Sequence, residues 1–346
     1  MEKRITLKDV ARKLGVHHTT VSRALRNSPR LPPATRQKIQ AAARALGYRV
    51  NAAARALVVH RQIARPPVEH GALALLADAG LAGEEGPVSV LMAARRQAAR
   101  LGYQIDIIDS HAPGLDGRKL TRILKARGID GLLVLPPRFD LKAPRRLRLD
   151  WPLFSAVILG HGLFWPHLHR VDDDHFGNAR QLTRKLISLG YRRIGLCMGR
   201  PMATLHAGGG WEGGYLIEMK RLGECPPVFW YESVDLEAPA FPAIRDWVLR
   251  ERLDAIMMDN NNSAIKFAWK GGFPIPEKLG IASLTSFNPQ ISGIHPPFER
   301  VWTTAVDFLV HLIHSNQRGI PEFPQRLLLE GAWVPGKTVR RMNREK

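Results

Sequence analysis

The pattern of hydrophobic and polar positions is clearest between Thr6 and Leu25, where it predicts two short helices separated by a turn at Gly15. Apolar residues recur there at helical spacing and form one face: Leu7, Val10, Ala11, Leu14, Val16, Val21, Ala24 and Leu25. The opposite side of the second segment carries hydrogen-bonding or cationic side chains, namely His17, His18, Thr19, Ser22, Arg23 and Arg26. A helix with one apolar face and one donor-rich face fits the major groove of DNA, so the pattern indicates a helix-turn-helix DNA reader.

Two further helical segments are predicted before residue 58. A third helix is expected over roughly Ala34 to Leu46, after the helix-breaking stretch NSPRLPP, and Gly47 ends it. The segment from Asn51 to Leu57 begins with a good N-cap residue and is rich in alanine, so it has high helix propensity but almost nothing to bury by itself. We therefore expect this helix to form only against a partner.

From Gly71 onward, short apolar runs of strand length alternate with amphipathic helices. The runs include GALALLAD, YQIDIIDS, DGLLVLPP and PLFSAVIL, and a second series begins after HRVDDDHFG with the helix NARQLTRKLISLG and the strand YRRIGLCMG. Continuous apolar strands that alternate with helices predict parallel sheets covered on both faces. We expect two such α/β halves, with a helix near Pro297 to Ser315 returning to the first half and RLLLEGAWV re-entering the second.

The charge distribution points to a polyanionic partner at the N-terminal end. The 346 residues carry a net charge of +20, and residues 1 to 65 hold 15 Lys and Arg against two acids, a local net charge of +13. Cys197 and Cys225 cannot build a disulfide framework, which indicates a reducing compartment. The start lacks a signal-peptide pattern and no long uncharged apolar run follows, so we expect a cytoplasmic protein without a membrane segment.

The N-terminal elements together resemble a known family. The segments TLKDVARKLGV, TTVSRAL and TRQKIQAAARALGYRVNAAARAL look like the DNA-binding headpiece and hinge helix of LacI/GalR-family transcription regulators. That resemblance implies that Arg23 contacts a base edge, where a guanidinium can bridge O6 and N7 of guanine. It implies that Leu57 wedges into the minor groove and that Ala54 lies where the two hinge helices of a dimer approach closely. The predicted DNA-binding residues are Thr6, His17, His18, Thr19, Thr20, Ser22, Arg23, Asn27, Asn51, Ala54 and Leu57.

Two positions depart from the family's pattern. Family members usually carry a helix-capping serine where this chain has His17, and again where it has Pro32. His17 is a poorer cap, although its imidazole could reach a phosphate, and it is equally compatible with an exposed turn residue. Pro32 with Pro33 could fix the entry to the third helix by rigidity.

The later alternation of strands and helices resembles the family's periplasmic-binding-protein-like domain, in which a ligand cleft lies between two lobes. The stretch VDDDHFGNARQLTRKLISLGYRRIGL fits the start of the second lobe. The resemblance implies an all-α helix-turn-helix headpiece at 1–50, a hinge helix and linker at 51–69, and a two-lobe α/β effector-binding and dimerisation domain with parallel sheets at 70–346. The first lobe is expected at about 70–165 and 291–320 and the second at about 166–290 and 321–340, joined by three crossovers that form a hinge.

The resemblance also places effector contacts at strand ends, on Asp78, Arg138, Asp173, Trp211, Asn261, Phe287 and Asn288. Two of these depart from the commonest pattern, since Trp211 replaces an arginine that grips sugar hydroxyls and Asn261 replaces an aspartate. Both changes remove charge, but a pyranose can still stack on tryptophan and hydrogen-bond to asparagine. The same residues are compatible with a different effector, with an unused cleft, or with plain packing.

Two other motifs could in principle bind a cofactor or a metal ion. The stretch GGGWEGG matches G-x-G-x-x-G at Gly208, Gly210 and Gly213, but it does not follow a strand directly, as a dinucleotide-binding loop requires. The segment HLHRVDDDH gathers metal-capable side chains: His167, His169, Asp172, Asp173, Asp174 and His175. Its acids fit a helix N-terminus equally well, because the helix dipole favours negative charge there. No nucleophile paired with a base stands out, so we expect no cofactor, no metal and no enzymatic activity.

The sequence therefore predicts a homodimeric, sequence-specific transcription regulator, in its leading form a repressor. Its expected partners are a near-palindromic operator in double-stranded DNA and a small-molecule effector of sugar type, which acts either as an inducer or as a co-repressor. The alternative is a small-molecule-binding protein with a vestigial headpiece, and the intact Arg23 and Leu57 argue against it.

Overall fold

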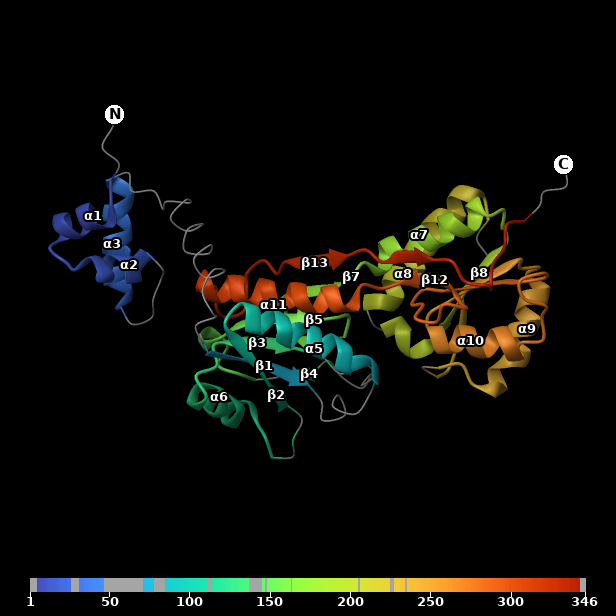
Figure 1. Ribbon diagram of the computed structural model, residues 1–346, viewed down its shortest axis with the longest axis horizontal. Coiled ribbons are helices and arrows are strands. Elements are labelled where there is room, and N and C mark those ends of the chain that lie inside the picture. The colour runs from blue at the N-terminus through green and yellow to red at the C-terminus, as the bar shows by residue number, and fades with distance from the viewer. Residues whose placement is uncertain are drawn as a thin grey trace.

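A helical headpiece is followed in the chain by two α/β lobes (Figure 1). The computed structural model describes residues 5–25, 31–46, 71–77, 85–110, 112, 114–136, 145–146, 148–162, 164–204, 206–224, 227–233 and 235–342.

The headpiece consists of α1 (Leu7–Leu14), α2 (His18–Leu25) and α3 (Pro33–Ala45). Thr6 caps α1 through a capping box, in which its side chain accepts from the Asp9 backbone N–H and the Asp9 carboxylate accepts from the Thr6 backbone N–H. Gly15 ends α1 in the left-handed conformation, with a φ of 62°, which the turn to α2 requires. The helices share a small core of Val10, Ala11, Val21, Ala24, Ile39 and Ala43. The predicted helices and their turn are confirmed.

The first lobe is built on a sheet with the strand order β13-β7-β5-β3-β1-β2, in which every neighbouring pair is parallel. Helices α5 (Glu85–Arg100) and α11 (Phe298–His314) cover one face, and α6 (Gly117–Ala126) covers the other. The strands are β1 (Gly71–Ala77), β2 (Tyr103–Asp109), β3 (Gly131–Val134), β5 (Ser155–Leu159), β7 (His169–Asp173) and β13 (Arg326–Leu329).

The second lobe is built on a sheet with the order β14-β12-β11-β10-β8-β9, which is parallel except for the antiparallel pair of β12 and β14. Helices α7 (His175–Ser188) and α8 (His206–Leu222) cover one face, and α9 (Phe241–Arg250) and α10 (Asn261–Lys270) cover the other. The strands are β8 (Ile194–Gly199), β9 (Phe229–Tyr231), β10 (Ala255–Met258), β11 (Gly280–Ser283), β12 (Ser292–His295) and β14 (Ala332–Val334).

Five short elements complete the part of the chain that the structure describes. Strands β4 (Arg145–Arg146) and β6 (Phe164–Trp165) pair with each other, and 3₁₀ turns span Trp151–Leu153, Arg200–Thr204 and Ala238–Ala240. The prediction of two α/β halves with parallel sheets covered on both faces is confirmed.

The chain crosses between the lobes at Asp174, at Pro296–Pro297 and at Glu330–Gly331. Hydrogen bonds join the first and third crossings, since Leu329 O accepts from the Asp174 N–H at 2.8 Å and Asn178 Oδ1 accepts from the Gly331 N–H at 2.7 Å. The crossings are therefore held together as one junction between the sheets.

Three strands belong to a different sheet from the one expected. Strands β7 and β13 pair with each other in the first sheet, although residues 166–290 and 321–340 were assigned to the second lobe. Strand β12 belongs to the second sheet, although residues 291–320 were assigned to the first. The assignment was wrong for these strands because the sheet that a strand joins depends on its hydrogen-bonded neighbour, which its own apolar pattern does not reveal.

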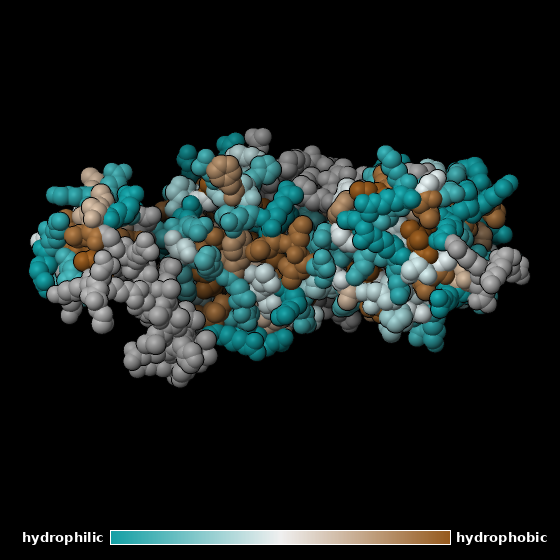
Figure 2. Space-filling view, turned by 90° about the horizontal axis from the view of Figure 1, so that it is seen from above, coloured by the Kyte–Doolittle hydropathy of each residue, from teal (hydrophilic) through white to brown (hydrophobic). Residues whose placement is uncertain are grey.

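On the face that Figure 2 shows, most of the coloured surface is hydrophilic, with apolar patches over both lobes. Among the helices that the structure describes, none is long and apolar enough to cross a membrane.

Candidate nucleic-acid interface and ligand cleft

The outward face of α2 carries polar side chains above a buried apolar base. Val21 and Ala24 are buried, whereas His18, Thr19 and Arg23 are exposed, and Thr20 and Ser22 are half-buried. Imidazole, hydroxyl and guanidinium groups can bond to phosphates and to base edges, so this face is chemically equipped to contact DNA. Four predicted contacts lie outside the described residues: Asn27, Asn51, Ala54 and Leu57.

Two of the predicted contacts have local bonds of their own. The Thr6 hydroxyl donates to Asp9 Oδ2 at 2.6 Å as part of the cap of α1. His17 lies just before α2, with its Nδ1 2.9 Å from Thr19 Oγ1 and accepting from the Thr19 N–H at 3.5 Å. The imidazole thus provides a long version of the bond that a capping serine makes. Pro32 makes no side-chain bond to α3, and Pro33 occupies the first turn of that helix.

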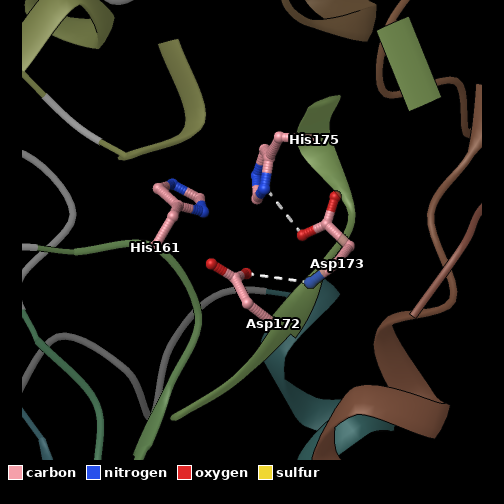
Figure 3. A group of neighbouring side chains, drawn as sticks. All are labelled: His161, Asp172, Asp173 and His175. Atoms are coloured by element: carbon pink, nitrogen blue, oxygen red, sulfur yellow. Dashed lines mark hydrogen bonds and ion pairs between the residues drawn. The ribbon is translucent and has the colours of Figure 1, made fainter. Parts of the chain in front are cut away.

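Four polar side chains converge where β5 and β7 end, at the first crossing (Figure 3). Asp172 and Asp173 end β7, His175 begins α7, and His161 follows β5; one nitrogen or oxygen of each lies within 4.8 Å of the others. Asp173 Oδ1 is 3.4 Å from His175 Nε2, and Asp172 Oδ1 accepts from the Asp173 backbone N–H at 3.0 Å. The rings of His161 and His175 meet edge to face, with centroids 5.1 Å apart. We call these four residues the crossing cluster.

Burial dominates the electrostatics of the crossing cluster. It raises the pKa of Asp172 well above the ordinary range, and the neighbouring Asp173 carboxylate raises that pKa further. Burial lowers the pKa of His175, against the opposite effect of the neighbouring Asp173 carboxylate. Arg170, buried on the same strand, donates to the backbone carbonyls of Gly160 and Gly162.

The sequence located the crossing cluster only in part. Asp172, Asp173 and His175 were singled out among the metal-capable residues, but the other three, His167, His169 and Asp174, are not members. His169 starts β7, where its Nδ1 accepts from the Gln325 N–H at 3.0 Å. His161 was missed because it belongs to the neighbouring strand of the sheet, and only the pairing of β5 with β7 brings it near.

Two buried hydrogen-bond donors lie near His175 without partners among the described residues. Trp211 packs against His175 with ring centroids 5.1 Å apart, is 3% exposed, and has an unpaired indole N–H. The side-chain nitrogen of Asn178, one turn after His175, is also unpaired, although its oxygen accepts from Gly331. A buried donor left unpaired costs about 1–3 kcal/mol, so an oxygen-bearing ligand that reached these groups would gain affinity. The indole N–H of Trp247, in the core on the other face of the sheet, is unpaired as well.

The glycine-rich stretch around Trp211 lies within helix α8 and packs against α7. A Cβ on Gly210 would lie 2.9 Å from His175 Cβ, and one on Gly214 would overlap the carbonyl oxygen of Phe176. Gly210 and Gly214 thus allow a close approach of two helices. The G-x-G-x-x-G match lies inside a helix and not in a loop that runs directly from a strand to a helix, as a dinucleotide-binding loop does.

A second group of predicted residues lies at the carboxyl edge of the second sheet. Asn261 Oδ1 accepts from the backbone N–H groups of Phe287 and Asn288, both at 3.3 Å. Phe287 is 51% exposed and contacts the rings of His295 and Phe298, each with centroids 5.4 Å apart. The structure thus brings Asn261, Phe287 and Asn288 together, while Asp78 and Arg138 lie outside the described residues.

Sequence reasoning missed a buried carboxylate at the same edge. Asp259, 1% exposed, follows β10 and accepts from the Gly199 N–H at 2.8 Å and from the Tyr231 hydroxyl at 2.7 Å. Burial raises its pKa to about 6, and these hydrogen bonds limit the rise. Because Gly199 ends β8 and Tyr231 ends β9, Asp259 joins the ends of three strands. In the sequence, the only sign of this role was the position of Asp259 directly after an apolar run.

Two family profiles match the chain. The profile of bacterial regulatory proteins of the lacI family covers residues 6–51, and that of the periplasmic binding protein-like domain covers residues 183–339. The chain thus joins a DNA-binding domain of the lacI type to a periplasmic binding protein-like domain. The resemblance expected from the sequence is confirmed: this is the domain combination of a DNA-binding transcription regulator, and the named relatives are regulators.

Named relatives support the same assignment. The transcriptional regulator CelR of Thermobifida fusca is 33% identical over 200 residues, which are 57% of this chain and 56% of that protein. The repressor PurR of Edwardsiella ictaluri is 25% identical over 324 residues, 90% of this chain and 91% of that one. Among solved structures, a CelR–cellobiose complex has a TM-score of 0.58 at 22% identity and covers 97% of this chain and 100% of its own. A lac repressor dimer bound to operator and an anti-inducer has a TM-score of 0.56 at 19% identity, with 97% and 99% covered. These structures share the fold of this chain.

Proposed function

We propose that this regulator is a homodimeric repressor of the lacI family that reads a near-palindromic operator with α2 of each protomer and responds to a small molecule held between its lobes. The observation that carries the proposal is the outward face of α2, where His18, Thr19 and Arg23 are exposed above the buried Val21 and Ala24. A dimer would repeat this face about a two-fold axis, and two-fold symmetry in a protein calls for two-fold symmetry in its DNA site. Such a protein acts in the cytoplasm, where bacterial DNA lies.

The contacts divide into base readout and backbone positioning. Arg23 reads a guanine, and His18 and Thr19 read neighbouring base edges. Thr6, His17, Thr20, Ser22 and Asn27 contact the sugar–phosphate backbone and fix the register of the helix. Residues from Asn51 to Leu57 form the hinge helix, in which Ala54 meets its copy in the partner and Leu57 wedges into the minor groove.

The proposed effector is a small saccharide. The unpaired donors of Trp211 and Asn178 suit hydroxyl oxygens, and the half-exposed ring of Phe287 suits the apolar face of a pyranose. Asp173, Asn261 and Asn288 add acceptors and amides along the two sheet edges. The relative CelR, solved with cellobiose, makes a β-linked disaccharide the first probe.

The lobe junction provides the route from effector to DNA. We place the first lobe at about 70–173 and 298–329 and the second at about 174–295 and 330–342, following sheet membership. A ligand that contacts both sheet edges changes the orientation of the two lobes relative to each other. That change alters how the two hinge helices of the dimer pair at the operator centre. The change in operator affinity cannot exceed the difference in the ligand's affinity for the two states.

The test compares operator binding with and without cellobiose, using the full chain and an operator selected from random DNA. We expect saturating cellobiose to change the operator Kd by about five- to 150-fold, the usual range of allosteric coupling. Trp211→Phe removes the indole N–H and should weaken cellobiose binding. Trp247→Phe, which removes an unpaired indole N–H on the other face of the sheet, should leave it unchanged. Equal effects of the two substitutions would refute the assignment of Trp211, and the absence of coupling would refute cellobiose as effector.

A further inference from the structure

We propose that the crossing cluster of His161, Asp172, Asp173 and His175 binds a divalent transition-metal ion, with Zn²⁺ as the best match. The proposal does not require DNA binding or a particular effector, although it shares Asp173 with the proposed effector site, and it rests on the geometry of these four side chains (Figure 3).

The donor set is the first argument. Two imidazole nitrogens and two carboxylate oxygens are ligands typical of tetrahedral Zn²⁺. With metal–ligand bonds of about 2.1 Å, neighbouring ligand atoms of a tetrahedron lie about 3.4 Å apart. The distance from Asp173 Oδ1 to His175 Nε2 is 3.4 Å, and the four ligand atoms lie within 4.8 Å of one another. His161 is the half-buried member, so a rotation of its side chain can draw the set together.

The charge balance is the second argument. Asp172 and Asp173 are 4% and 3% exposed, and two adjacent carboxylates out of water must be neutralised, either by a proton on one of them or by a nearby cation. Arg170 supplies one buried positive charge on the same strand, but its guanidinium donates to the carbonyls of Gly160 and Gly162. A divalent cation between the two carboxylates would compensate them directly.

The setting of His175 is the third argument. Asp174 caps α7 by accepting from the Gly177 N–H at 2.8 Å, which fixes the first turn of the helix that carries His175. Trp211 packs on the imidazole, and Gly210 leaves room for it. This support preorganises the ligand.

The site would also tie the lobes together. His161, Asp172 and Asp173 belong to the first lobe, whereas His175 begins the first helix of the second. A metal ion held by all four would fix the start of α7 against the end of β7, at one of the three crossings.

The experiment titrates Co²⁺, and then Zn²⁺, into the full-length protein after removal of metals with a chelator. We expect one Co²⁺ per chain with the visible absorption bands of tetrahedral cobalt, displaced by Zn²⁺. His161→Ala removes a ligand, and Asp173→Asn removes a charge while keeping the shape of the side chain. Each should weaken Co²⁺ binding at least about tenfold. His167→Ala is the matched control, because His167 is exposed in the same segment but lies outside the cluster.

Each result decides the proposal. Loss of the tetrahedral bands in His161→Ala and Asp173→Asn, with wild-type binding in His167→Ala, supports it. The absence of tetrahedral bands in the wild-type protein, or equal Co²⁺ affinity in all four proteins, overturns it. Circular dichroism checks that any variant that has lost Co²⁺ binding is still folded.

Discussion

At the scale of single residues, Arg23 has the role that follows most directly from its position. It is exposed on α2 between Val21 and Ala24, which anchor the helix in the headpiece core. A guanidinium there can form two parallel hydrogen bonds to a guanine, whereas a lysine ammonium is a point charge that carries less directional information.

Substitution of Arg23 by lysine should therefore reduce specificity more than it reduces attraction to DNA. We expect Arg23→Lys to lower discrimination for guanine by about 1–3 kcal/mol at one position of each half-site, with nearly unchanged salt dependence. Competition binding with single-base operator variants measures this loss. Arg12→Lys, the same change at an exposed position of α1, should leave discrimination intact. An identical result for both variants would remove Arg23 from the reading face.

Asp259 makes a pH-dependent contribution to stability. Its pKa is about 6 in the folded protein against an ordinary value of 3.8, mainly because it is buried. Between these values the folded protein retains a proton that the unfolded chain has lost, so this residue lowers the free energy of unfolding as the pH rises, by about 3 kcal/mol in total. Asp172, whose pKa is also raised by burial, adds a fall of the same sign. Chemical denaturation from pH 4 to 7 should therefore show a fall that is smaller in Asp259→Asn, by about 2–3 kcal/mol, than in the wild type and in the exposed control Asp246→Asn. Parallel curves for all three proteins would contradict the assignment.

At the scale of elements, local pattern predicted most helices and strands but not their partners. The helical spacing of apolar residues from Leu7 to Leu25 and the continuous apolar runs after Gly71 were sufficient to predict these helices and strands, because each pattern reflects the burial of its own segment. Sheet membership of β7, β12 and β13 was not predictable in this way. The crossing cluster was not fully predictable for the same reason, because His161 comes near His175 only through the pairing of β5 with β7.

Two glycines of α8 provide a matched test of how closely α7 and α8 pack. A Cβ on Gly214 would overlap the carbonyl oxygen of Phe176, whereas a Cβ on Gly213 would lie 3.7 Å from the Phe176 ring, an ordinary contact. Gly214→Ala should therefore cost about 1–3 kcal/mol, since α7 and α8 must separate. Gly213→Ala should be neutral or stabilising by up to about 1 kcal/mol, because alanine favours the helix. Thermal unfolding of the two variants compares them, and equal destabilisation would show that α7 and α8 are not in close contact.

At the scale of the whole molecule, a helical headpiece precedes two lobes whose sheets meet at one junction. The three crossings lie at one place, two of them joined by hydrogen bonds through Asp174 and Asn178. The crossing cluster and the unpaired donors of Trp211 and Asn178 lie at the same junction. Ligands bound there contact the chain where small shifts alter the relation of the lobes.

The strongly basic N-terminal end draws the protein to any DNA, so binding alone does not test the account. The most direct measurement is selection of preferred sites by the purified full-length protein from a pool of random DNA, at a salt concentration that suppresses nonspecific binding. The account predicts enrichment of a two-fold-symmetric site whose two half-sites are read by the α2 helices of a dimer. Failure to enrich any sequence, or enrichment of a site without two-fold symmetry, would contradict it.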